Sequence, residues 1–258
     1  MKISRRAACF LVIASGFAAV PMLAQAEPAL DVIYVPTPQA VVNRMLEMAE
    51  VKNSDFVIDL GCGDGRMIVT AAQKYGSSGY GVDINPVRIN ESNANAKKAG
   101  VTDKVTFKVA NLFDESLAKA DVMTMYLLEE INLRLRPKIL DELKPGARVV
   151  SHAFSMGTWE PDASDIVDNK NIYLWYVPAK VEGKWQVSGE QEMTLELTQQ
   201  FQMTMGNATI NGKQVPVAGR LKGKEMTLTL DIDGKKRELK GVVEGNEVKG
   251  NGWNARKV

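Results

Sequence analysis

The sequence has few of the residues that build disulfide frameworks and metal sites. Its 258 residues include two cysteines, Cys9 and Cys62, and a single histidine, His152. A structural zinc site needs about four cysteine or histidine ligands, and no Gly-x-Ser-x-Gly motif nominates a nucleophile for His152 to activate. Metal-dependent and acyl-transfer chemistry are therefore disfavoured, and we expect no bound metal.

The N-terminus lacks an apolar run long enough to span a bilayer, which takes roughly 20 residues. Its apolar stretch, residues 7–20, is broken by Ser15 and Gly16, follows three basic residues and leads to Ala24-Gln25-Ala26. This order is typical of a secretory signal peptide. We predict that residues 1–26 are a signal peptide, cleaved near Ala26 to leave a periplasmic or secreted chain without a transmembrane segment. A membrane anchor is the alternative.

No charge of either sign dominates the chain. It has 32 basic and 31 acidic side chains, and removal of residues 1–26 leaves 29 basic against 31 acidic groups. Residues 211–258 hold a local excess of basic groups, which we attribute to solubility and to protection of strand edges. Because binding to nucleic acid relies on Lys and Arg that neutralise phosphates, we expect no nucleic-acid partner.

Strand and helix patterns alternate between residues 56 and 154. Thr37-Pro38 and Asn85-Pro86 each have the pattern of an N-cap followed by proline at the first helical position. The expected strands are 56–60, 79–83, 105–109, 121–127 and 147–154, and the expected helices begin near residues 38, 65, 86 and 132. Two more strands, 171–178 and 184–187, would form a terminal hairpin at the edge. The fold class predicted is α/β, a Rossmann-like, doubly wound and mostly parallel seven-stranded sheet.

The pattern changes to a period of two beyond residue 189. Turn pairs such as Asn211-Gly212, Asp233-Gly234 and Gly245-Asn246 separate the alternating stretches, and such pairs favour tight hairpins. We therefore predict a small C-terminal antiparallel β module. The chain divides into the signal peptide (1–26), the α/β domain (27–188) and the all-β module (189–258).

The strongest functional signal is VIDLGCGDGR at residues 57–66, a buried strand followed by a Gly-x-Gly-x-Gly turn that opens a helix. Asp83 ends the next strand, where a carboxylate can accept both hydroxyls of a ribose. A tight turn and a helix cap are the purely structural alternatives, but the two signals together predict a nucleoside site. Arg66 stands where the NAD fingerprint has its third glycine, which disfavours a nicotinamide-dependent oxidoreductase.

The order of these motifs over residues 30–160 resembles that of the class I, seven-strand methyltransferases that use S-adenosylmethionine. The resemblance implies this cofactor and a methyltransferase activity. It implies that Asp59 reaches the methionine amino group, that Gly61 and Gly63 line the methionine and the ribose, and that Asp83 holds the ribose. Asn111 and Leu112 would flank the adenine, although the family usually has aspartate in place of Asn111. Asp64 and Ile84 complete the expected set.

A narrower resemblance rests on YVPTPQAVVNRML (34–46), DLGCGDGR (59–66), MYLL (125–128), LKPGARVVSHAF (143–154) and Trp159-Glu160-Pro161. These segments are similar to the lysine methyltransferases that modify the ATP synthase c subunit and the adenine nucleotide translocase, and to their bacterial relatives. The resemblance implies a protein lysine as acceptor, while a small-molecule acceptor stays open. The signal peptide and the β module depart from the mitochondrial enzymes.

Candidates for the acceptor side follow the fourth strand, beside the switch point where doubly wound sheets bind ligands. They are Tyr126, whose alternative role is a core aromatic, and Glu129, whose alternative role is to begin a helix. Thr37 and its neighbouring prolines could form a lid, and His152 is expected to pack or hydrogen-bond near the end of its strand. A catalytically idle nucleoside-binding scaffold is the alternative to an enzyme.

Overall fold

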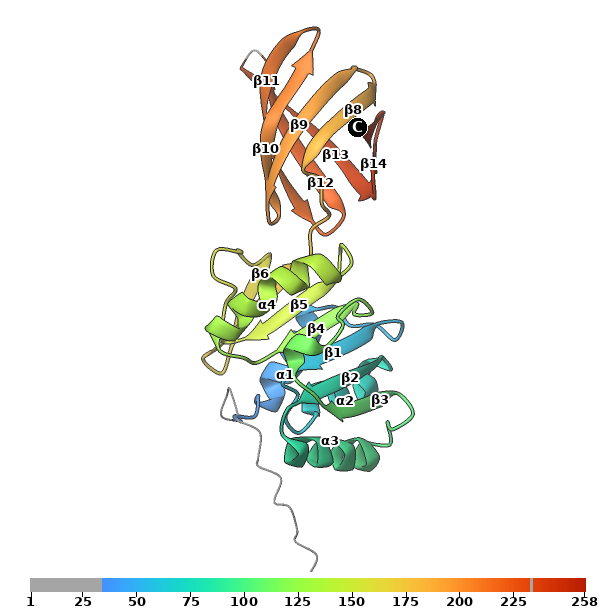
Figure 1. The fold of residues 1–258 in the computed structure, drawn as a ribbon, viewed down its shortest axis with the longest axis vertical. Coiled ribbons are helices and arrows are strands. Elements are labelled where there is room, and N and C mark those ends of the chain that lie inside the picture. Colours follow the sequence, from blue (N-terminus) through green and yellow to red (C-terminus); the bar gives the residue numbers. More distant parts are fainter. Residues whose placement is uncertain (1–33, 233) are drawn as a thin grey trace, which may run out of the picture.

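The structure is a computed structural model that describes residues 34–232 and 234–258. The predicted signal peptide lies outside these residues. Within them, no helix is both long and apolar enough to cross a membrane. A layered α/β part and a β-barrel are stacked along the long axis of the molecule (Figure 1).

Seven strands form the predicted sheet, in the order β3-β2-β1-β4-β5-β7-β6. Strands β1 to β5 are parallel, whereas β7 pairs antiparallel with β5 and with β6. The order reverses between β1 and β4, which is the switch point of the sheet. The bounds are β1 (Phe56–Leu60), β2 (Ser78–Asp83), β3 (Val105–Val109), β4 (Val122–Met125), β5 (Arg148–His152), β6 (Ala163–Val167) and β7 (Lys170–Tyr176). The fold predicted from the sequence is confirmed.

Within residues 34–258, position 233 apart, four α-helices and one short 3-10 turn, η1 (Leu112–Asp114), accompany the sheet. The helices are α1 (Gln39–Met48), α2 (Arg66–Tyr75), α3 (Pro86–Ala99) and α4 (Glu129–Glu142). Asn85 caps α3 as predicted, because its side chain accepts from the Val87 amide at 2.9 Å. The same prediction for Thr37 was wrong: Pro38 occupies the N-cap of α1, and no side chain of the described residues caps that helix. The Thr37 hydroxyl instead lies 3.0 Å from Nδ1 of His152.

The sheet is buried on both faces, as a parallel sheet requires. Val57 packs in the cluster that contains the apolar side chains of α1 and α2, while Ile58 and Leu60 pack in the cluster that contains those of α4. Because successive side chains of a strand point to opposite faces, β1 is held from both sides. This central strand leads directly into the glycine-rich turn.

The C-terminal module is a closed, eight-stranded antiparallel barrel. Its strands are β8 (Gly183–Gly189), β9 (Met193–Gln200), β10 (Met203–Ile210), β11 (Lys213–Lys222), β12 (Glu225–Ile232), β13 (Lys235–Glu244), β14 (Glu247–Gly250) and β15 (Trp253–Lys257). The predicted hairpin of strands 171–178 and 184–187 was wrong, because β8 pairs with β9 and β15 inside the barrel, and β7 pairs with β6. The division at residue 188 falls within β8 and stays a prediction.

The barrel rests on the loop between β5 and β6. Phe201 of the β9–β10 turn stacks on Trp159, with ring centroids 6.0 Å apart. The Gln202 side chain donates to the carbonyl of Glu160 at 2.8 Å, and Arg220 of β11 binds the carboxylate of Asp162 at 2.7 Å. This loop, residues 153–162, therefore contacts the barrel, and its Met156 and Trp159 side chains are buried.

Candidate functional site

One cavity of about 510 Å³ lies at the carboxyl ends of β1, β2 and β4, at the switch point of the sheet. This volume falls in the range of small-molecule sites. The predicted site residues that line it are Asp59, Gly61, Asp64, Asp83, Ile84, Asn111, Leu112 and Tyr126. Residues 34–37, Cys62, Arg66, Arg88, Leu127 and Phe154 are among its other walls. Gly63 and Glu129 are not part of its lining.

The glycine-rich turn follows β1 as a tight backbone loop. The amides of Gly61 and Cys62 both donate to the carbonyl of Val82, at 2.9 and 2.8 Å. Gly61, Gly63 and Gly65 have φ values of 74°, 54° and 76°, a region in which other L-residues are strained. A Cβ at Gly63 would lie 2.3 Å from the ring of Tyr34. Glycine is thus required both for the turn and for the approach of the N-terminal segment.

Asp59 is an acid buried at the end of β1. Its side chain accepts a hydrogen bond from the Thr124 hydroxyl of β4 at 2.7 Å, and it is 6% exposed. Burial raises the pKa of Asp59 to about 7; the Thr124 hydrogen bond lowers it, and the nearby carboxylates of Asp83 and Asp64 raise it further. No ion pair to Asp59 is found among the described residues. An acid of this kind suits a cationic ligand group.

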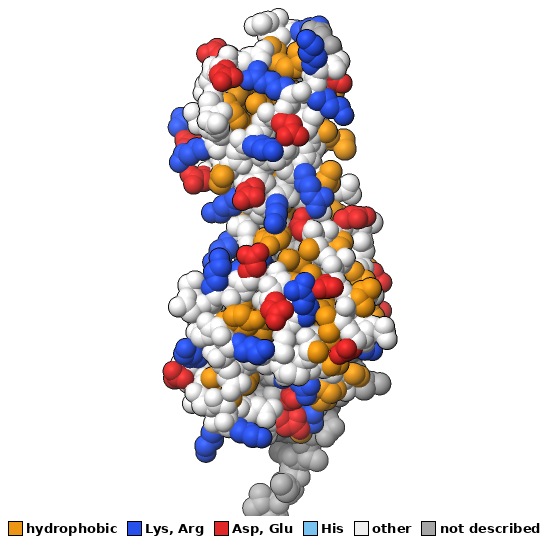
Figure 2. All heavy atoms as spheres, turned by 180° about the vertical axis from the view of Figure 1, so that it is seen from behind, with side chains coloured by type: hydrophobic (Ala, Val, Ile, Leu, Met, Phe, Trp, Pro, Cys, Tyr) orange, Lys and Arg blue, Asp and Glu red, His pale blue; other side chains and the backbone are white. Residues whose placement is uncertain are grey.

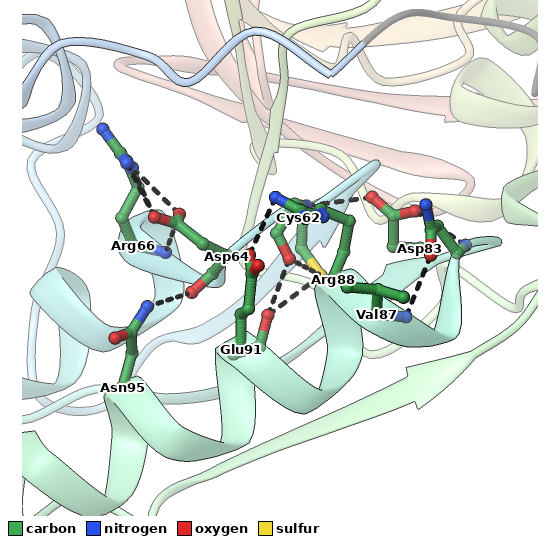
Figure 3. A network of polar contacts seen from close by, with 11 residues as sticks. Cys62, Asp64, Arg66, Asp83, Val87, Arg88, Glu91 and Asn95 are labelled. Atoms are coloured by element: carbon green, nitrogen blue, oxygen red, sulfur yellow. Dashed lines mark hydrogen bonds and ion pairs between the residues drawn. The ribbon is translucent and has the colours of Figure 1, made fainter.

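Asp83 is held at the end of β2 by two backbone amides. One carboxylate oxygen accepts from Gly63 at 3.0 Å, and the other accepts from Asn85 at 2.9 Å (Figure 3). The carboxylate therefore connects the glycine turn to the start of α3. Each oxygen retains a lone pair, so the group can still accept hydrogen bonds from a ligand in the cavity.

Arg66 connects the glycine turn to the N-terminal segment, a role that the sequence analysis missed. Its guanidinium binds the Asp64 carboxylate, with Nη2 to Oδ2 at 2.6 Å, and its Nη1 donates to the carbonyl of Thr37 at 2.8 Å. Arg66 lowers the pKa of Asp64 against the effect of burial. The Asn95 side chain fixes the Asp64 carbonyl at 2.9 Å (Figure 3). The sequence signal for this role was the arginine that stands where the NAD fingerprint has its third glycine.

Tyr126 and His152 form a second group at the other end of the cavity. Their ring centroids are 3.8 Å apart, and the ring of Phe154 lies 6.1 Å from that of Tyr126. His152 is 1% exposed, and its burial lowers its pKa to about 4, with a smaller contribution from Lys170. It is therefore neutral at physiological pH. The predicted hydrogen bond of His152 near the end of its strand is the one to Thr37.

Glu129 and Asn111 are the other two predicted residues whose surroundings the structure shows. Glu129 is exposed at the start of α4, and its carboxylate accepts from the Ser155 hydroxyl at 2.7 Å. Its part in proton transfer stays a prediction. Asn111 lines the cavity while its side-chain oxygen accepts from the Phe113 amide at 3.1 Å, which caps η1. The side-chain NH2 group of Asn111 can still donate a hydrogen bond to a ligand at the edge of the cavity.

Several known proteins are similar to the α/β part of this chain. The family model for the ANTKMT methyltransferase domain matches residues 59–163. A protein-lysine N-methyltransferase of Saccharolobus islandicus (strain REY15A) is 46% identical over 149 residues, which are 56% of this chain and 92% of that protein. The Xenopus laevis lysine N-methyltransferase of the ATP synthase c subunit is 31% identical over 144 residues, which are 56% of this chain and 63% of that protein.

A solved structure is similar over the same region. The crystal structure of an RNA methyltransferase from Salinibacter ruber, in complex with S-adenosyl-L-homocysteine, is 44% identical with a TM-score of 0.56. The match covers 57% of this chain and 96% of that one. A Rossmann-like sheet with a glycine turn and two acids at its switch point defines a nucleoside-binding α/β enzyme.

The chain belongs to the S-adenosylmethionine-dependent methyltransferase family that contains these lysine-modifying relatives. It is an enzyme, and its cofactor is S-adenosylmethionine. The residues present fit this cofactor, because a buried acid that has no cationic partner in the described part of the chain and a second acid beside the glycine turn match its ammonium and its ribose.

Proposed function

We propose that this methyltransferase modifies the side-chain amine of a lysine in a protein. The observation that carries the proposal is a single cavity that joins the glycine turn to Tyr126 and Phe154. Donor and acceptor would meet in it. The names of the relatives from Saccharolobus and Xenopus support lysine as the acceptor.

On the donor side, six residues have roles in the proposal. Asp59 accepts the methionine ammonium of the cofactor, and Asp83 accepts the ribose hydroxyls. Asn111 and Leu112, at the cavity edge, flank the adenine. Asp64 and Ile84 close the cavity around these groups. When bound, S-adenosylmethionine supplies a methyl group on a positively charged sulfur.

On the acceptor side, the walls must favour the neutral amine. A lysine amine has an ordinary pKa of about 10.4 and is protonated at neutral pH. The apolar surface of Leu127 and Phe154 would desolvate it and so lower its pKa. Among the described residues none hydrogen-bonds the Tyr126 hydroxyl, which can therefore accept from the amine. The bound cofactor would supply its methyl group to this nitrogen after the ammonium proton has passed to solvent, and S-adenosylhomocysteine would be the leaving group.

RNA is the acceptor class named for the Salinibacter protein, and the surface charge argues against it here. Lys and Arg are interspersed with Asp and Glu over both parts of the molecule on the face in Figure 2. A phosphate-binding surface would gather basic side chains without acidic ones. Near neutrality of the whole chain points the same way.

We also propose that the enzyme acts outside the cytoplasm, on the basis of the signal-peptide pattern in residues 1–26. Fractionation of expressing cells should recover the chain outside the cytoplasm with Glu27 at its N-terminus. Recovery in the cytoplasm with residues 1–26 attached would contradict this.

The acceptor is tested by methyl transfer. Purified enzyme and radiolabelled S-adenosylmethionine are incubated with total extract from cells that lack the gene, and the labelled product is mapped by fragmentation. We expect methyl groups on lysine nitrogen that survive ribonuclease treatment. Label confined to oxygen, nucleic acid or small metabolites would reject the lysine proposal and leave the donor site standing. An Asp83→Ala enzyme serves as the control for transfer by contaminating enzymes.

A further inference from the structure

The end of β5 combines features that simple packing does not account for. His152 is completely enclosed, yet its Nε2 has no hydrogen-bond partner among the described residues. A buried polar atom without a partner is unfavourable by about 1–3 kcal/mol. The next residue, Ala153, has a φ of 65°, which is uncommon for a residue other than glycine. Such features tend to persist where function requires them.

The strained turn after His152 is held from several sides. The amide of Phe154 donates to the carbonyl of His152 at 2.9 Å, which closes a three-residue turn around Ala153. The side chain of Asn132, from α4, donates to the carbonyls of Phe154 and Ser155, both at 3.2 Å. The turn thus presents the ring of Phe154 to the cavity and keeps the imidazole beneath Tyr126.

The residue that His152 binds, Thr37, is fixed at two points. Its carbonyl accepts from Arg66 at the start of α2 at 2.8 Å, and its hydroxyl lies 3.0 Å from Nδ1 of His152. Thr37 lines the cavity next to Pro36 and is 8% exposed. The contact with Arg66 is on the donor side of the cavity, and the contact with His152 is on the side of Tyr126.

We propose that His152 is a positioning residue for methyl transfer: its ring supports Tyr126, and its bond to Thr37 fixes the 34–37 segment over the acceptor end of the cavity. The proposal rests on the proposed location of the acceptor at Tyr126, whatever the chemical class of that acceptor. The lowered pKa of His152 agrees with a role that needs no proton exchange. Arg66 would hold the same segment over the donor end.

The variant His152→Phe separates two hypotheses. If His152 only packs, the variant should be fully active; if His152 positions other groups, the variant should be slower. A phenyl ring keeps the stacking on Tyr126 and removes the unpartnered nitrogen, so a packing residue would tolerate the change with full activity. We expect an unchanged or higher melting temperature, S-adenosylhomocysteine affinity within about threefold of the original, and a transfer rate lowered about tenfold through misplaced groups. The rate is the initial incorporation of radiolabelled methyl groups into total cell extract at saturating donor.

Three further variants sharpen the test. Thr37→Val removes the same hydrogen bond from the other side and should lower the rate equally. The double variant should be no slower than either single one, since both remove one interaction. Arg66→Gln is the matched control and should weaken S-adenosylhomocysteine binding instead. His152→Phe with a full transfer rate, or with donor affinity reduced as much as the rate, would overturn the proposal.

The single histidine of the chain permits a test that needs no acceptor. The nitrogen-15 spectrum of histidine-labelled enzyme should contain one imidazole, neutral at pH 6, whose Nδ1 signal moves in Thr37→Val. An Nδ1 signal that is unaffected by Thr37→Val would also overturn the proposal. If the extract takes up label only in RNA or metabolites, the lysine proposal fails, and the His152 rates are then compared on that acceptor.

Discussion

The raised pKa of Asp59 should make donor binding depend on pH. Only the ionised carboxylate binds an ammonium group well, and half of the ligand-free enzyme carries the neutral acid near pH 7. S-Adenosylhomocysteine affinity should therefore fall about tenfold between pH 8 and pH 6, then about tenfold per unit below. Calorimetry across this range measures the affinity directly.

Asp59 should also make the stability of the folded enzyme depend on pH. Stability should fall as pH rises, whereas donor affinity increases. Because the pKa of Asp59 in the folded enzyme lies above the ordinary value of 3.8, the folded state binds the proton more tightly, and stability falls as pH rises from 3.8 to 7. Asp59→Asn removes this loss. It should stabilise the ligand-free enzyme above pH 7 by at most about 4 kcal/mol, while weakening S-adenosylhomocysteine binding at pH 8 by about 2–3 kcal/mol.

Two results would refute this reasoning. Affinity of the unaltered enzyme that changes less than about twofold between pH 8 and pH 6 would exclude an ammonium bound by a carboxyl of raised pKa. If the affinity of the Asp59→Asn variant depends on pH in the same way as that of the unaltered enzyme, Asp59 is not the titrating group. Thr124→Val offers an independent check, because loss of its hydrogen bond to the carboxylate should move the midpoint of the profile to higher pH.

Three other substitutions test the ribose site, the acceptor side of the cavity and the contact between the barrel and the α/β part. Asp83→Ala should weaken S-adenosylhomocysteine binding by about 2–4 kcal/mol, because the ribose loses charge-assisted hydrogen bonds; calorimetry with unchanged affinity would remove Asp83 from the site. Tyr126→Phe should lower kcat about 100-fold at constant donor affinity if the hydroxyl takes part in proton transfer, and an unaltered kcat in the radiolabel assay would exclude that role. Arg220→Ala removes the ion pair of the buried Asp162 carboxylate, so it should lower the melting temperature, and an unchanged melting temperature would contradict the assigned ion pair.

The sequence predicted the sheet and the donor end of the cavity because these depend on local signals. A buried strand, three glycines and an acid after the next strand define the turn and its neighbours wherever the rest of the chain lies. Asn85 behaved as predicted for the same reason, since a cap binds an amide two residues away. Such contacts are contained in short stretches of sequence.

The errors concern residues whose partners are distant in the chain. Thr37 has the sequence pattern of a helix cap, but an imidazole 115 positions away takes its hydroxyl. The alternation in β8 fits a hairpin with β7 as well as it fits a barrel, because a period of two shows which face is buried and does not identify the neighbouring strand. The strained turn at Ala153 carries no glycine that would have revealed it.

The contact between the barrel and the loop that joins β5 to β6 has a consequence for shorter members of the family. The Saccharolobus relative is 92% covered by 149 matched residues, which leaves no room in it for an added eight-stranded barrel. In this chain, removal of the barrel would uncover the face of Trp159 that now stacks on Phe201 and would leave Asp162 without its arginine. A truncated enzyme would then expose an aromatic surface prone to self-association. Excision of the catalytic half for engineering therefore calls for a redesigned loop surface, with polar residues in place of that aromatic contact.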